Sequence, residues 1–315
     1  MRGTLRVVAA RLGQGLAAAL GASVLVWALL PLAPGDPARR VLQARGIGDP
    51  QPVEIEAARV ELGLDQPLPV QYARWLGRAV RGDLSESYES GQPVLEELRT
   101  RLPATALLAV TAIAIAGLGA LPAALLAAAY RGRWPDALLR GLSLVGAALP
   151  AFLVGLFALQ VVVLGRGWGR ALSDGSPGQV WLPALVLALA RIADWSRLLR
   201  ASLLESLESG FILVSVARGA RRLRVLVRHA LPNALLPFLT AVGVGVGALL
   251  GGTPIVEAVF TWPGIGSYVV SAINARDLPV IQGFAALAAM AYVATSVAVD
   301  VLGGLLDPRT RKAKT

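Results

Sequence analysis

The chain has 315 residues, of which 55% are hydrophobic and 16% charged, and its mean hydropathy is +0.62. These values are well above those of soluble proteins. The apolar residues form continuous runs, and crossing a hydrocarbon core of ~30 Å takes roughly 20 such residues in a helix. Continuous runs indicate helices, because the strands of a membrane barrel would alternate. The sequence therefore predicts an all-α polytopic membrane protein.

Several kinds of site are excluded by what the sequence lacks. There is no cysteine, so disulfides and thiolate metal sites are impossible, and a single histidine, His229, excludes a His-rich metal site. There is no GxxxxGK[ST] phosphate-binding loop. No Ser/His/Asp set is credible with the only histidine in a basic loop. We therefore expect no enzyme activity and no cofactor or metal on this chain.

Six apolar segments are expected to cross the membrane. They are Leu12–Leu32, Pro103–Ala129, Gly141–Leu164, Trp181–Ser196, Leu235–Val256 and Val280–Leu306. The first is too long for the apolar part of a signal peptide and lacks a small-residue cleavage site, so we interpret it as a retained span. Three parts follow: 1–32 with the first span, a cap over 33–101, and a core over 102–315 that contains a loop at 205–234.

The cap is a polar region with two predicted helices, Glu54–Leu62 and Pro69–Val80. Its mixed charges suit a transient docking interface, although a purely structural lid is an alternative. It also holds two pairs of neighbouring carboxylates, Glu54 with Glu56 and Glu96 with Glu97. A solvated helix face explains these pairs better than acid–base chemistry.

The basic residues set the orientation. The predicted inner side, which includes both termini, carries 17 lysines and arginines but four acids, whereas the cap carries nine bases and eleven acids. Short cytoplasmic loops are enriched in Lys and Arg. Both termini are therefore expected in the cytoplasm. The same bias explains the net charge of +10 without a nucleic-acid partner.

The longest inner loop is basic and amphipathic. It reads FILVSVARGARRLRVLVRHALPNALLP from Phe211 to Pro237, which is far longer than a connection between spans requires. We expect two short helices broken at Gly219, since glycine permits a sharp turn. Such a loop presents a surface to another protein on the cytoplasmic side. The alternative is an amphipathic helix lying on the lipid surface.

Ordered motifs along nearly the whole chain carry a family resemblance. They include PGDPAR at Pro34–Arg39, ELGLDQPLPVQYARWL at Glu61–Leu76, LLRASLLE at Leu198–Glu205, ARG with HALPNALLP at Ala217–Pro237, GALLGGTPIVEAVFTWPGIG at Gly247–Gly266, ARDLPVIQG at Ala275–Gly283 and LLDPRTR at Leu305–Arg311. The chain resembles ABC-importer permeases of the dipeptide/oligopeptide/nickel family, in its first-permease branch.

The resemblance implies the type I (MetI-like) permease fold with six transmembrane helices, located in the bacterial cytoplasmic membrane. It implies a second homologous permease, two cytoplasmic ATPase subunits that bind ATP and Mg²⁺, and an extracytoplasmic substrate-binding protein. The chain would form half of a pathway that works by alternating access. The ATPase-coupling residues implied are Phe211, Ile212, Val214, Ala217, Arg218, Gly219, Arg222 and His229. Leu213–Val216 replace a more polar run of the family, so this contact is expected to be more apolar.

Three charged residues are candidates for the translocation path. Arg191 and Asp194 lie in the fourth span, where ionisable groups usually face a cavity or each other, and at i, i+3 they can pair on one helix face. A structural ion pair is the alternative. Glu257 follows a glycine-rich stretch of the fifth span and either contacts substrate or makes a structural hydrogen bond. The segment after TWPGIG is expected to form a short outer helix.

The substrate and the class of transporter leave alternatives open. Peptides are the broadest expectation for the family, whereas the short 165–180 loop and the GGTPIVE wording lean slightly toward nickel, carried as a chelate. An ion-coupled secondary transporter using Arg191 and Asp194 is a different class, but such carriers usually show internal repeats, which are not evident here. A membrane scaffold would leave the 211–237 loop unexplained.

Overall fold

The computed structural model describes residues 13–18, 20–21, 23–25, 27–28, 36–168, 170 and 172–306. Within these residues the regular structure is helical, with one isolated bridge between Glu86 and Pro93. The chain forms two compact units. Unit 1 comprises 1–8, 106–262 and 294–315, and unit 2 comprises 9–105 and 263–293. Of the predicted first span, residues 13–18, 20–21, 23–25 and 27–28 are described, and the C-terminal tail 307–315 lies outside the described residues.

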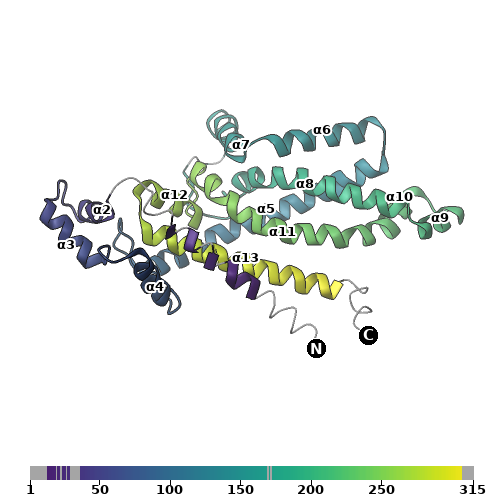
Figure 1. Cartoon of the computed structure of the whole chain (residues 1–315). Helices are drawn as coiled ribbons and strands as arrows, with labels where there is room; N and C mark the ends of the chain where they lie inside the picture. The colour runs from purple at the N-terminus through teal and green to yellow at the C-terminus, as the bar shows by residue number, and fades with distance from the viewer. Residues whose placement is uncertain are drawn as a thin grey trace. The chain divides into compact units, whose positions relative to one another are not determined.

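Unit 1 is a helical assembly in which α8 lies beside both α6 and α11 (Figure 1). Its elements are the larger part of α5 (Val94–Ala129), α6 (Trp134–Ala148), α7 (Ala151–Ala158), η2 (Leu159–Leu164), α8 (Trp181–Leu207), α9 (Gly210–Ala217), α10 (Arg222–Arg224), η3 (Val225–Ala230) and α11 (Leu231–Val259).

Small residues set the packing in unit 1. On α5, Ala116, Ala120, Ala124 and Ala128 are buried at intervals of four, which places them on one helix face. They share one core with large side chains of α8 and α11, among them Trp195 and Phe238. A Cβ added to Gly119 would lie 2.8 Å from the Ile192 side chain, and one added to Gly245 would lie 2.8 Å from Trp195. Close approach of this kind is typical of helices packed in membranes.

The predicted third span, Gly141–Leu164, falls on two helices with a sharp bend between them. The chain bends by 97° between α6 and the α7–η2 helix. The break lies at Leu149–Pro150, where Leu149 is extended (φ −79°, ψ 124°). The cause is Pro150, because proline disfavours the helical conformation of the residue before it.

Unit 2 contains the predicted cap helices as α3 (Pro52–Leu62) and α4 (Leu68–Ala79), and an additional helix, α2 (Pro37–Ala44). Asp36 caps α2 by accepting from the Ala38 backbone N–H at 3.0 Å. The predicted outer helix is present as α12 (Ile265–Ala275), and α13 (Leu278–Leu306) follows it. Within this unit α12 and the starts of α5 and α13 enclose a second apolar core that includes Val94, Leu98, Ile265 and Val280.

Helix length and composition support membrane spans in the described residues. Three helices, Val94–Ala129, Arg222–Gly243 and Leu278–Ala298, are long and apolar enough to cross, and a fourth is added if the bent pair counts as one span. The predicted fourth span falls in α8, which extends to Leu207 and carries four charged residues between Arg191 and Arg200. The count of six spans therefore stays a prediction.

Candidate functional site

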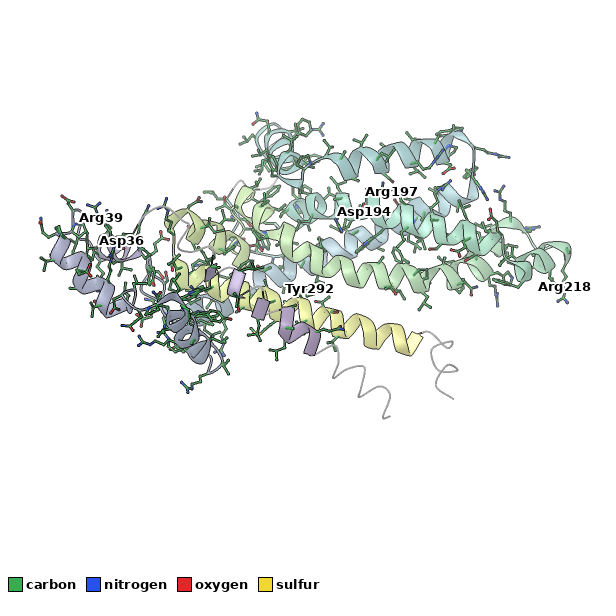
Figure 2. The ribbon with its side chains drawn as sticks, viewed as in Figure 1. Asp36, Arg39, Asp194, Arg197, Arg218 and Tyr292 are labelled. Carbon is green, nitrogen blue, oxygen red and sulfur yellow. The ribbon has the colours of Figure 1, made fainter. Side chains whose placement is uncertain are left out.

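The long inner loop has the predicted geometry. Helix α8 ends at Leu207, α9 follows from Gly210 to Ala217, and the chain then turns at Gly219, whose φ of +81° lies in the left-handed region. After the turn α10 and η3 lead without a break into α11. Figure 2 shows Arg218 at the far end of this loop. A glycine is suited here, because residues with a Cβ rarely adopt a positive φ.

Helix α9 has one side chain fixed in the core and others facing outward. Ile212 is 2% exposed and packs in the unit 1 core, which also contains Leu203 and Val225. Phe211 and Val214, in contrast, are 51% and 53% exposed. The buried Ile212 therefore holds α9 against its own chain, and two apolar side chains beside it remain available for contact.

The arginines of the loop are exposed to solvent. Arg218 and Arg222 are exposed, as are Ala217 and Gly219, while His229 is half-buried. The His229 carbonyl oxygen accepts from the Asn233 side-chain amide at 2.8 Å, a contact within the helix that starts α11. The predicted coupling residues thus form one continuous surface segment, apart from Ile212 in the core and the partly covered His229.

A buried carboxylate, which the sequence analysis missed, lies next to this loop. Asp136 in the first turn of α6 is 1% exposed. Its two oxygens accept from Nε and Nη2 of Arg200 on α8 at 2.7 and 2.8 Å. The Gly132 backbone N–H donates to it at 3.0 Å, and Arg140 lies 3.7 Å away. Paired charges are the usual form in which carboxylates are buried.

A second ion pair joins the same two segments. Arg131 Nη1 lies 2.6 Å from Glu208 Oε1, at the end of α8. The first turn of α6 and the turn that precedes it are thus each tied to α8, and the second of these ion pairs lies at the end of α8, just before α9. The sequence placed these residues on the cytoplasmic side but gave no pairing, because the partners lie 64 and 77 positions apart.

The two charged candidates in α8 do pair with each other. Arg191 Nη2 lies 3.3 Å from Asp194 Oδ2, and Arg197 Nη2 donates to Asp194 Oδ1 at 2.9 Å. All three side chains are partly exposed, at 26%, 38% and 42%. Figure 2 shows Asp194 and Arg197 on the same helix. The ion pair at i, i+3 is confirmed, while a role in the translocation path stays a prediction.

Glu257 lies near the end of α11 and is fully buried, as is its neighbour Thr253 at 1% exposure. Its backbone carbonyl accepts from the Trp262 N–H at 2.8 Å, which closes the helix end. Its burial is consistent with the structural alternative for this residue. A contact with substrate would require the surrounding side chains to move.

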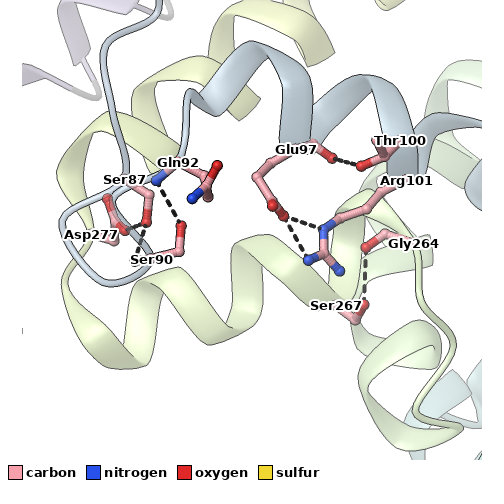
Figure 3. A network of polar contacts seen from close by, with 9 residues as sticks. All are labelled: Ser87, Ser90, Gln92, Glu97, Thr100, Arg101, Gly264, Ser267 and Asp277. Carbon is pink, nitrogen blue, oxygen red and sulfur yellow. Dashed lines mark hydrogen bonds and ion pairs between the residues drawn. The ribbon is translucent and has the colours of Figure 1, made fainter.

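The predicted carboxylate pairs of the cap have structural partners. Glu54 accepts from the Gln51 backbone N–H at 2.7 Å and so caps α3, and Glu56 lies 3.8 Å from Arg59. Glu97 in the first turn of α5 pairs with Arg101 at 2.7 Å (Figure 3). The interpretation of these residues as helix-face charges agrees with the contacts they make.

A polar network holds the 83–91 loop to the turn between α12 and α13 within unit 2. Asp277 is 2% exposed and accepts from the Ser87 hydroxyl and from the Glu89 backbone N–H (Figure 3). Burial, together with the charge of Asp277, raises the pKa of Tyr88 to about 12. Nearby, the Ile265 backbone N–H donates to the Thr105 hydroxyl at 2.8 Å.

Among the described residues no group of three or more His, Cys, Asp and Glu side chains is placed to hold a metal ion. The site is a helical unit whose 211–222 segment carries exposed apolar and basic side chains.

Comparison with known proteins agrees with this description. Residues 120–312 match the family described as "binding-protein-dependent transport system inner membrane component", and residues 4–109 match the N-terminal model of the same kind of protein. The chain belongs to this family and is a permease subunit of ABC importers, with the MetI-like helical fold. Proteins of this family work with a substrate-binding protein and ATPase partners.

Individual relatives cover nearly the whole chain. The glutathione transport system permease protein GsiC of Shigella flexneri serotype 5b is 36% identical over 289 residues, which is 92% of this chain and 93% of the relative. The probable D,D-dipeptide transport system permease protein DdpB of Escherichia coli (strain K12) is 37% identical over 320 residues, or 92% of each chain. The resemblance to peptide permeases is thus confirmed. The secondary-transporter alternative finds no support in these comparisons.

Proposed function

We propose that this chain is the membrane subunit of an ATP-driven importer of short peptides, and that it forms half of a heterodimeric translocation pathway with a second homologous permease. Both termini lie in the cytoplasm. Two ATPase subunits, which bind ATP and Mg²⁺, contact the membrane subunit on its cytoplasmic side. Peptides are favoured as substrates because two relatives are named as glutathione and D,D-dipeptide permeases. The nickel interpretation has no comparable support.

The observation that carries this proposal is the form of α9. The helix is fixed to its own core through Ile212, while Phe211 and Val214 remain exposed beside Arg218. An apolar patch rimmed by charges on a short, anchored helix fits a groove of a partner protein. Because α9 follows α8 directly, a displacement of α9 by the ATPases is passed to the helix that carries Arg191 and Asp194.

The alternating cycle follows from that linkage. When ATP closes the two ATPase subunits, α9 moves with them and the spans open outward to receive a peptide from the binding protein. Hydrolysis returns the pathway to its inward-open state. Arg191 and Asp194 satisfy each other in the resting arrangement, and they supply polar groups to a passing peptide backbone. Glu257 is a candidate for the same role at the outer end of α11.

The docking step can be tested by introducing negative charges into the apolar patch formed by Phe211 and Val214. Phe211→Asp with Val214→Asp should lose the co-purifying ATPase subunits and the transport-linked ATPase activity, because two charges would be placed in an apolar contact. Both side chains are about half exposed, so the fold should persist. Val53→Asp, at an 80% exposed position of the cap, is the control. Full ATPase retention by the double variant would contradict the docking assignment.

The energy source and the substrate need a separate measurement. The complete importer in proteoliposomes should take up radiolabelled trialanine only with binding protein and ATP, and uptake should persist when ion gradients are collapsed. Uptake driven by an ion gradient without ATP would instead favour the secondary transporter. Uptake of a nickel chelate without peptide uptake would overturn the substrate assignment.

A further inference from the structure

Unit 2 contains a large cavity that the importer mechanism above does not use. Its volume is about 1080 Å³, slightly above the range of roughly 300–1,000 Å³ that is usual for small-molecule sites. It is lined by α4, by the 83–91 loop, by Asp36 and Arg45 at the two ends of α2, and by charged residues of α3. The start of α13 contributes Leu278, Pro279 and Gln282. All of these segments belong to the same compact unit.

One wall of the cavity is cationic and belongs to a single helix face. Gln71, Arg74, Trp75 and Arg78 line the cavity from α4, at the spacing of three and four that places residues on one side of a helix. Within the described part of the chain, neither Arg74 nor Arg78 has a carboxylate within ion-pair distance, unlike Arg45 and Arg59.

An unused hydrogen-bond donor lies in the same wall. Trp75 is 4% exposed, and its indole N–H has no acceptor among the residues that the structure describes. Buried indole N–H groups usually find a partner. The ring itself packs against Tyr72 and Trp27, with centroids 6.0 and 6.1 Å away. The arrangement provides a cluster of aromatic rings beside the two arginines.

The other wall is acidic. Glu86 and Glu89 line the cavity from the 83–91 loop, both are exposed, and no ion pair involving either is found between described residues. The loop is nevertheless well held, because Asp277 accepts from the Glu89 backbone N–H at 3.1 Å and Glu86 forms the isolated bridge with Pro93. A ligand that enters the cavity therefore meets two arginines of α4 and two carboxylates of the 83–91 loop.

We propose that this cavity binds a short peptide as a zwitterion. The C-terminal carboxylate accepts from Arg74 and Arg78, the α-amino group lies toward Glu86 and Glu89, and an apolar side chain contacts the aromatic cluster. Both free termini are recognised by opposite charge. The inference rests on the proposed peptide import and assigns the cap a substrate site of its own.

The test uses the complete importer in lipid nanodiscs without its binding protein. Trialanine, trialanine amide and N-acetyl-trialanine are titrated by calorimetry. We expect trialanine to bind and each blocked form to bind at least tenfold more weakly. The variant Arg74→Gln with Arg78→Gln should lose at least tenfold in trialanine affinity. The control Arg81→Gln removes an exposed arginine that does not line the cavity and should leave binding unchanged.

Each outcome has a distinct meaning. Unchanged trialanine affinity in the Arg74/Arg78 variant, or no binding to the wild type, overturns the cavity site. If ATP-dependent trialanine uptake persists in proteoliposomes in either case, the proposed function stands without it. If the variant instead weakens only the affinity for the binding protein, the cavity is a docking surface and the peptide site is likewise refuted. Normal folding of the variants is checked by their co-purification with the partner permease.

Discussion

Removing the carboxylate of Asp136 should destabilise the part of unit 1 where α6 meets α8 more than any other single charge deletion in these two helices. Asp136 is 1% exposed, and it satisfies both a bidentate arginine and a backbone N–H. Breaking a buried pair by deleting one partner typically costs about 3–5 kcal/mol, because the remaining charge is left buried. The Arg200 side chain is only 19% exposed, so water can compensate little.

The assay is chemical unfolding in detergent micelles, followed by tryptophan fluorescence. Asp136→Ala should lower the free energy of unfolding by ~3–5 kcal/mol. Asp136→Leu combined with Arg200→Met should recover most of that loss, since apolar replacements of a buried pair are often tolerated. The double-mutant cycle then gives the coupling between the two side chains.

A matched control is available on α8. Asp194 also accepts from an arginine, but its side chain is 38% exposed, so Asp194→Ala should cost less than ~1 kcal/mol. If Asp136→Ala cost no more than Asp194→Ala, or if the double variant were worse than the single one, the reasoning about the buried pair would be refuted.

Three further predictions concern local features. Gly219→Ala should lower the free energy of unfolding by about 1–2 kcal/mol. The positive φ alone causes this loss, because no atom lies within 4 Å of the added methyl group. Unfolding measurements should show no such loss for Gly210→Ala, which is equally open but lacks a positive φ. Gly245→Ala should lower the free energy of unfolding by about 1–3 kcal/mol, because the added Cβ would lie 2.8 Å from Trp195. Thermal unfolding should show that Trp195→Phe, combined with Gly245→Ala, recovers part of this loss. Tyr88 should titrate near pH 12 in absorbance at 295 nm, and Tyr88→Phe should remove that step. Since its pKa is raised on folding, its contribution to cap stability is complete below pH ~10 and is lost as the pH rises toward 12; a Tyr88→Phe cap with the same alkaline loss would contradict this.

Local chemistry made much of the fold predictable. The cap helices and the turn at Gly219 were predicted from helical periodicity and from the conformational freedom of glycine, and both are present. These features depend on residues close together in the chain. The third span was predicted less well, because its apolar composition is continuous and only Pro150 marks the 97° bend.

Contacts between distant segments could not be predicted in the same way. Nothing in the local pattern distinguishes Asp136 from the other acids of the predicted cytoplasmic side, and its partner Arg200 is one of many arginines there. The cavity of the cap likewise depends on bringing Arg74 and Glu86 into one lining. Arg191 and Asp194 were found because their partners lie three residues apart on one helix.

The alanine row of α5 has a consequence for how the permease moves. Ala116, Ala120, Ala124 and Ala128 present a face without protruding side chains, repeated every four residues, which is close to one helical turn. Interlocked side chains must leave their rotamers before two helices can shift, whereas a flat row lets the opposing side chains step from one methyl group to the next. Ile192, which fills the space beside Gly119, interlocks the same two helices, so any shift along the alanine row must first displace this side chain.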